Sequence, residues 1–171
     1  MKKMLFALTI AMTCASNVFA GQAKVTWQDP EKFTDIRAGN ETRQGFQDRV
    51  FKDLEQVFSD MAKQLPDDYQ MEVVVTDVDL AGDINGTYRQ MGNDLRIIKE
   101  IYWPRMSFNY SIKDAKSAVI ASGTENVKDM NFMSRSRFTS GNSGFAYEEK
   151  MLVDWFKQLQ KDKKLPAAEK K

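Results

Sequence analysis

The 171-residue chain contains no histidine and a single cysteine, Cys14. Without histidine, neither a Ser–His nor a Cys–His nucleophilic pair can form, and zinc and copper sites lose their most common ligand. A histidine-based pH switch is excluded for the same reason. Carboxylate, lysine, tyrosine or serine–lysine chemistry remains open, and the sequence indicates no cofactor.

An excess of either charge is also missing. The chain carries 25 basic and 24 acidic residues, and its first 20 residues contain Lys2 and Lys3 and no acid, so the remainder has 23 against 24. This balance provides no electrostatic footprint for nucleic acid and no polybasic anchor for anionic lipid. Nucleic acid is therefore not an expected partner.

Long apolar runs are confined to the N-terminus. Two lysines precede a short apolar run over residues 4–12, and Val18 and Ala20 occupy the two positions that a signal peptidase inspects. This pattern predicts a cleaved secretory signal over residues 1–20 and a mature chain that begins at Gly21 in the periplasm. The run is too short to span a bilayer, and no longer one follows, so no transmembrane segment is expected in the mature chain.

Cys14 lies inside this predicted signal. A lipoprotein site would need a small residue before the cysteine and a leucine three residues before it, but Thr13 and Ala11 occupy those positions, so cleavage after Ala20 fits better. The mature chain then has no disulfide, and its stability depends on its core. Its length suits a single α+β domain over residues 21–160, followed by a flexible charged tail over 161–171.

Hydrophobic periodicity predicts the order strand, helix, three strands, helix. The expected elements are a strand over 24–28, a helix from an N-cap at Asn40 to Pro66, a strand over 71–80, an extended stretch over 95–112, a strand over 117–127 and a helix starting at Ser143 or Gly144. Residues 81–93 and 128–144 are expected to be loops. The pattern favours a two-layer α+β sandwich of about four mostly antiparallel strands with two helices on one face.

The apolar positions change phase within the 95–112 stretch. They are odd-numbered up to Trp103 and even-numbered after Pro104, at Met106, Phe108, Tyr110 and Ile112. A regular strand cannot change phase and keep one face inward, and proline removes a ladder donor. We therefore expect a bulge or strand break at residues 103–105, near a sheet edge, with the even-numbered set under the long helix.

Two groups of residues are candidates for a site. Tyr102, Trp103 and Arg105, beside the phase change, are of types enriched at protein interfaces, although a core tryptophan beside a bulge explains them too. The partner that an interface implies is another envelope protein, and the sequence does not indicate the oligomeric state. A second possibility, anion binding by Arg135 and Arg137 in the 128–144 loop, competes with a simple solvated loop.

The second group is acidic and consists of Asp77, Asp79 and Asp83. The register does not fit an EF-hand, but a looser site for a hard cation, or an acid–base pair for glycoside cleavage, remains an alternative to a solvated strand end. The leading hypothesis is a non-enzymatic periplasmic binding or envelope-assembly module. The alternative is a carboxylate-dependent hydrolase or a divalent-cation-binding protein.

Several motifs are specific as a set and cover nearly the whole mature chain. They lie at residues 25–30, 34–37, 75–83, 97–99, 104–106, 128–130, 147–148, 151–152 and 155–156. With them the chain resembles a family of small secreted proteobacterial proteins, the domain-of-unknown-function family numbered three thousand and sixteen. The resemblance implies a Gram-negative envelope setting and transfers no catalytic residue. One departure is Glu149, where the family pattern has lysine.

Overall fold

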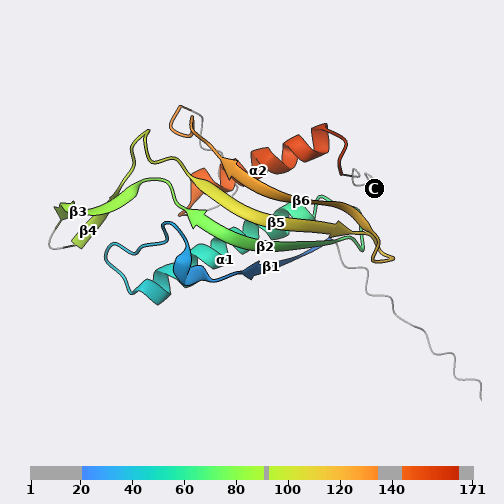
Figure 1. Ribbon diagram of the computed structural model, residues 1–171, viewed down its shortest axis with the longest axis horizontal. Helices are drawn as coiled ribbons and strands as arrows, with labels where there is room; N and C mark the ends of the chain where they lie inside the picture. Colours follow the sequence, from blue (N-terminus) through green and yellow to red (C-terminus); the bar gives the residue numbers. More distant parts are fainter. Residues whose placement is uncertain (1–20, 91–92, 135–143, 166–171) are drawn as a thin grey trace, which may run out of the picture.

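A four-stranded sheet with two helices on one face forms the body of the protein (Figure 1). The computed structural model describes residues 21–90, 93–134 and 144–165. The predicted signal, Cys14, Arg135, Arg137 and the end of the predicted tail lie outside these ranges. The elements are β1 (Gln22–Trp27), a short 3-10 turn η1 (Pro30–Lys32), α1 (Arg43–Ala62), β2 (Gln70–Asp79), β3 (Asp83–Gln90), β4 (Asn93–Ile97), β5 (Arg105–Lys113), β6 (Val119–Lys128) and α2 (Ala146–Lys161).

The strand order in the main sheet is β1-β2-β5-β6. Strand β1 runs parallel to β2, and the other two pairs are antiparallel. The parallel pair arises because α1 is the crossover that connects β1 to β2. The α+β class, the mostly antiparallel sheet and the two helices are therefore confirmed.

The core lies between the sheet and the helices. Met106, Phe108, Tyr110 and Ile112 on β5 are all buried, so the predicted even-numbered face is confirmed. The Phe108 ring packs edge-on against Phe58 of α1, with centroids 5.7 Å apart, and against Trp155 of α2, at 4.9 Å. Phe108 thus joins both helices to the sheet.

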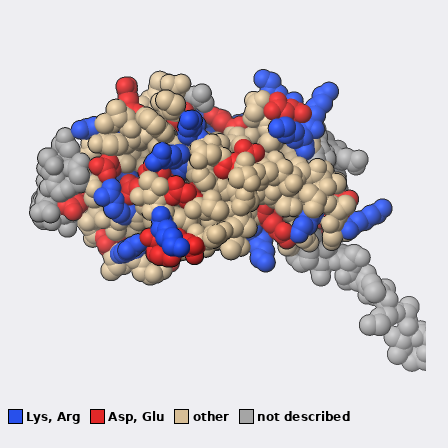
Figure 2. Space-filling view, viewed as in Figure 1, with Lys and Arg blue, Asp and Glu red and all other residues tan. Residues whose placement is uncertain are grey.

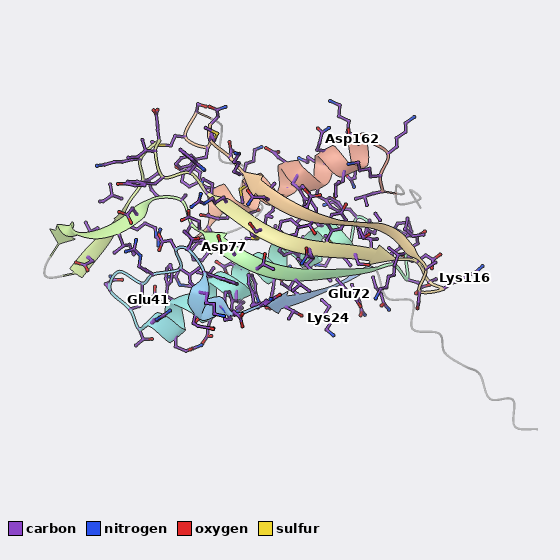
Figure 3. The ribbon with its side chains drawn as sticks, in the orientation of Figure 1. Lys24, Glu41, Glu72, Asp77, Lys116 and Asp162 are labelled. Carbon is purple, nitrogen blue, oxygen red and sulfur yellow. The ribbon has the colours of Figure 1, made fainter. Side chains whose placement is uncertain are left out.

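The opposite face of the sheet is polar. Lys24 of β1 and Glu72 of β2 are cross-strand partners on this face (Figure 3). Lys113 of β5 forms an ion pair with Glu72 at 2.6 Å. Figure 2 shows both signs of charge intermixed on the visible surface, with no large area of one sign. Such a face is typical of an antiparallel sheet that is solvated on one side.

A β-bulge in β2 was not predicted. The register shifts between Val75 and Asp77, so Val78 and Leu80 face the core together with Val75. An unbroken alternation along β2 would place Val78 and Leu80 on the face opposite Val75, but the extra residue at the bulge reverses the phase. The bulge leaves Asp77 on the face away from the core.

Three other predictions need correction. The N-cap of α1 is Thr42 and not Asn40, because the Thr42 hydroxyl accepts a hydrogen bond from the Gly45 N–H at 3.1 Å. Helix α2 begins at Ala146, after the predicted Ser143 or Gly144. Residues 81–93, expected to be a loop, contribute β3 and the start of β4, a separate two-stranded hairpin that projects from one end of the sheet (Figure 1).

The predicted interruption at residues 103–105 is confirmed as a strand break. Strand β4 ends at Ile97, and β5 begins at Arg105, directly after Pro104. The expectation that this point lies near a sheet edge is wrong, because β5 is an inner strand between β2 and β6. The proline is tolerated there because it stands just before the strand and outside the hydrogen-bonded ladder.

Candidate functional site

The two groups of candidate residues meet in one cleft, which we call the kink cleft. It has a volume of about 340 Å³ and lies where β2 ends, β3 begins and the chain enters β5. Its lining includes five of the six predicted residues, namely Asp79, Asp83, Tyr102, Trp103 and Arg105. The sixth, Asp77, lies outside the lining. Residues that sequence reasoning treated as two separate candidates are therefore neighbours in space.

Each acid of the predicted cluster already has a partner. Asp77 accepts hydrogen bonds from the backbone N–H and the hydroxyl of Thr34, at 2.7 and 2.8 Å. Asp79 forms an ion pair with Arg105 at 2.8 Å, and Asp83 forms one with Arg37 at 2.6 Å. In the part of the chain that the structure describes, no three potential metal ligands converge. The cleft therefore presents paired charges of both signs.

A buried carboxylate lies behind these pairs. Asp35 is buried, and its oxygens accept hydrogen bonds from Arg96 at 2.9 and 3.3 Å and from Arg37 at 3.1 Å. Burial opposes ionisation of Asp35, but Arg96 and Arg37 outweigh it and hold its pKa below the usual range. Burial raises the pKa of the neighbouring Asp79, and the charge of Arg105 only partly opposes this. The pKa values of Asp35 and Asp79 shift in opposite directions because Asp35 contacts two guanidinium groups, whereas Asp79 is paired with Arg105 alone.

A tight turn at Ala81 and Gly82 separates the kink cleft from a second cavity. Gly82 has a positive φ of 84°, and a Cβ atom there would lie 2.8 Å from the Ile97 carbonyl oxygen, so the turn requires glycine. Arg96 donates to the carbonyl oxygens of Ala81 and Gly82, at 3.4 and 3.2 Å, and holds the turn against β4. Gly82 lines the kink cleft, whereas Ala81 lines the second cavity.

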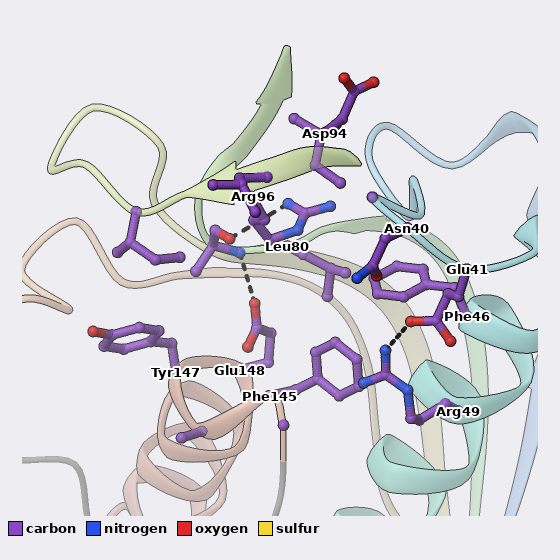
Figure 4. A pocket seen from close by; sticks show the side chains of 17 residues that line it. Asn40, Glu41, Phe46, Arg49, Leu80, Asp94, Arg96, Phe145, Tyr147 and Glu148 are labelled. Carbon is purple, nitrogen blue, oxygen red and sulfur yellow. Dashed lines mark hydrogen bonds and ion pairs between the residues drawn. The ribbon is translucent and has the colours of Figure 1, made fainter. Parts of the chain in front are cut away.

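The second cavity, which we call the helix-end pocket, is the larger of the two, at about 470 Å³. It lies between the N-terminal ends of α1 and α2 and the base of the β3–β4 hairpin (Figure 4). Its lining is mixed, with apolar side chains interrupted by a few charged ones. The lining includes Glu41, Phe46, Arg49, Leu80, Ala81, Ile84, Arg96, Phe145 and Glu148.

A buried carboxyl group forms one end of this pocket. Glu148, in the first turn of α2, is only 3% exposed, and its Oε1 accepts a hydrogen bond of 2.6 Å from the Ala81 N–H (Figure 4). Burial raises the pKa of Glu148, although its backbone hydrogen bonds and the charge of Arg96 act in the opposite direction. A perturbed acid in a cavity is a feature of functional sites.

An aromatic pair that holds a cation forms the other end. The rings of Phe46 and Phe145 meet edge to face with centroids 5.9 Å apart. The Arg49 guanidinium lies over both rings, 5.1 Å from the first centroid and 5.4 Å from the second, and is ion-paired with Glu41. Arg96 also lies over the Phe46 ring. Its Nε is buried and has no hydrogen-bond partner among the described residues.

Sequence reasoning missed this pocket because its walls come from segments far apart in the chain. One signal was available. Glu148 stands three, four and seven residues before Met151, Leu152 and Trp155, so it occupies the apolar stripe of α2. A glutamate on the buried face of a helix is rare without a partner or a function.

The sequence profile of one protein family matches residues 21–158. The family is described as a protein of unknown function (DUF3016). The chain belongs to this family. This membership confirms the resemblance drawn from the motifs. No curated protein and no solved structure matches the chain. Within residues 21–90, 93–134 and 144–165, no helix is both long and apolar enough to cross a membrane.

Proposed function

We propose that the protein is an exported, non-enzymatic binding protein of the periplasm that holds a small ligand in the helix-end pocket. The observation that carries this proposal is a cavity of about 470 Å³ that combines a buried carboxyl group with an aromatic pair. Small-ligand sites have volumes of this order, with largely apolar walls and a few placed polar groups. The export signal predicted over residues 1–20 supports the periplasmic setting.

Hydrolysis by a carboxylate pair is less well supported. Such a reaction needs one acid and one base that both reach the substrate. In the kink cleft, Asp79 and Asp83 are each ion-paired with an arginine, and Asp35 is held by two. These contacts neutralise the carboxylates and fix their oxygens. The geometry therefore favours binding over carboxylate-pair catalysis.

The test is ligand titration followed by backbone NMR. A panel of small amines, carboxylic acids and alcohols with phenyl or hexyl bodies is added to ¹⁵N-labelled protein. At least one class should shift the amide resonances of Ala81, Gly144 and Ala146, which line the pocket. Absence of a response to every class would contradict the proposal.

A variant with a filled pocket tests where the ligand binds, and the same change at an exposed position is its control. Ala146 lines the cavity, so Ala146→Phe should remove the response by occupying the space of the ligand. Ala118→Phe makes the same change at an exposed position between β5 and β6 and should leave the response intact. Shifts that persist in Ala146→Phe would place the ligand elsewhere and overturn the assignment.

Docking of another envelope protein at the kink is a second candidate function. Ile101 is 66% exposed beside Tyr102 and Trp103, and Met130 is 55% exposed. The hydrogen bond from the Asp129 N–H to the Pro104 carbonyl oxygen, 3.2 Å long, joins the two segments that carry these side chains. Exposed apolar residues beside aromatic ones favour a protein interface.

A photo-crosslinking residue tests this second candidate in intact cells. Placed at position 101, it should produce one crosslinked species of defined mass, and Trp103→Ala should remove it. The same residue at Lys116, at the opposite end of the sheet (Figure 3), should produce none. Equal crosslinking from both positions would contradict an interface at the kink.

A further inference from the structure

The two arginines that line the helix-end pocket have acidic partners, whereas its buried glutamate has no basic partner among the described residues. Arg49 is ion-paired with Glu41, and Arg96 with Asp35, which lies outside the pocket lining. Glu148 is different, because no lysine or arginine of the described residues forms an ion pair with it. Its carboxyl group accepts hydrogen bonds from the N–H of Ala81 and from its own backbone N–H, and acceptor capacity remains on the two oxygens.

The aromatic pair shows which charge the other wall accepts. Arg49 already places a cation over the faces of Phe46 and Phe145, at 5.1 and 5.4 Å from their centroids. Aromatic faces carry negative electrostatic potential, so they attract an ammonium or guanidinium group and repel a carboxylate. Glu148 and the aromatic faces therefore favour a positively charged group, and the two arginines of the lining are neutralised by their ion pairs with Glu41 and Asp35.

We infer that the helix-end pocket selects a small organic ammonium ion, a primary amine carried on an apolar body. The ammonium group would donate to the Glu148 carboxylate, and the body would pack against Leu80 and Ile84 beside the aromatic pair. An ammonium group is a pure hydrogen-bond donor and an ionised carboxylate is a pure acceptor, so the pair is complementary. An anionic ligand would meet a buried carboxylate and two aromatic faces instead.

Three probes with the same phenyl body test this inference, which rests on the proposed small-ligand function. The probes are phenethylamine, 3-phenylpropionate and 2-phenylethanol, titrated into the full mature chain at neutral pH. Phenethylamine should bind at least about tenfold more tightly than the other two, because a charge-assisted hydrogen bond exceeds a neutral one. Tighter binding of 3-phenylpropionate, or equal affinities for all three, would overturn the ammonium inference and leave the proposed function standing. Absence of binding by all three would count against both.

Variants then assign the selectivity to residues. Glu148→Gln keeps the size of the side chain and should remove the preference for the amine, whereas Glu31→Gln, at an exposed position of η1, should retain it. Arg49→Gln removes the resident cation and should strengthen amine binding, because the aromatic pair and Glu41 are then vacated. Weaker amine binding in Arg49→Gln would contradict the inference. If Glu148→Gln does not fold, the Arg49→Gln result decides alone.

Discussion

The Glu148 carboxylate, in the first turn of α2, accepts a 2.6 Å hydrogen bond from the N–H of Ala81, just beyond the end of β2. The two residues are 67 positions apart in the chain. Their contact joins the second helix to the turn between the two cavities, and it buries an acid at the end of the larger one. The pairing of a buried acid with a neutral donor has measurable consequences.

Glu148 should make the stability of the protein depend on pH. Its pKa in the folded protein lies above the ordinary value of 4.5, because burial disfavours the charged form. As pH rises above 4.5, the Glu148 carboxyl group loses its proton in the unfolded chain before it does so in the folded protein. The contribution of Glu148 to the free energy of unfolding therefore declines until the pH exceeds the folded pKa. Glutamine does not titrate. The stability of Glu148→Gln relative to the wild type should therefore rise with pH.

Urea unfolding from pH 4.5 to neutrality measures this difference. Of the groups that act on Glu148, Arg96 favours its charged form and Asp79 opposes it, so both are kept unchanged. Glu31→Gln at the surface controls for the loss of one formal charge. A wild-type-to-variant difference that stays constant with pH would show that Glu148 ionises normally in the folded protein.

Truncation of Phe108 should be among the costly core changes. The ring is fully buried and packs edge-on against Phe58 and Trp155. Phe108→Ala should lower the free energy of unfolding by about 3–5 kcal/mol, because it leaves a cavity between both helices and the sheet. Ser111→Ala, on the outer face of the same strand, should cost under about 1 kcal/mol in the same denaturation experiment. Similar losses for both would contradict the assignment of faces.

The two arginines on Asp35 should differ sharply in importance. Arg96 is mostly buried with Asp35, whereas the Arg37 side chain is 58% exposed. Arg96→Gln should cost about 3 kcal/mol or more, because it leaves a buried carboxylate short of its main partner. Arg37→Gln should cost under about 1 kcal/mol, since solvent screens an exposed pair. Chemical denaturation of both variants compares them.

A double-mutant cycle separates the lost ion pair from lost packing. If the cost of Arg96→Gln comes from the uncompensated charge, adding Asp35→Asn should recover a substantial part of it. Full additivity of the two substitutions would mean that Arg96 stabilises the fold by packing and by its backbone hydrogen bonds alone.

Export should remove the first 20 residues. The mature protein recovered from the periplasmic fraction should begin at Gly21, because Val18 and Ala20 fit the recognition positions of the peptidase. Intact-mass measurement decides between this product and the alternatives. Ala20→Trp should block processing and leave the precursor mass. A lipid-modified Cys14, or a mature protein that retains Met1, would contradict the prediction.

Local periodicity was enough to assign most of the sheet and both helices. The even-numbered face of β5 was predictable because side chains alternate along any strand, so the burial of Phe108 followed from its neighbours in sequence. The break before Arg105 followed from Pro104 and the phase change. The hairpin of β3 and β4 was missed because Gly86 and the polar residues around it show no alternation in the sequence. The bulge after Val75 was missed because the three consecutive valines at 73–75 are apolar on both faces and hide the change of phase that follows them.

The site depended on tertiary structure. Sequence reasoning selected Tyr102, Trp103, Arg105 and the aspartates by residue type. Only packing showed that five of them share one cleft and that arginines neutralise Asp79 and Asp83. The helix-end pocket was not predictable in this way. The positions of Phe46, Ala81 and Glu148 are set by how α1, β2 and α2 pack together. Periodicity is determined within one segment, whereas a cavity is determined by distances between segments, and those distances arise only when the core forms.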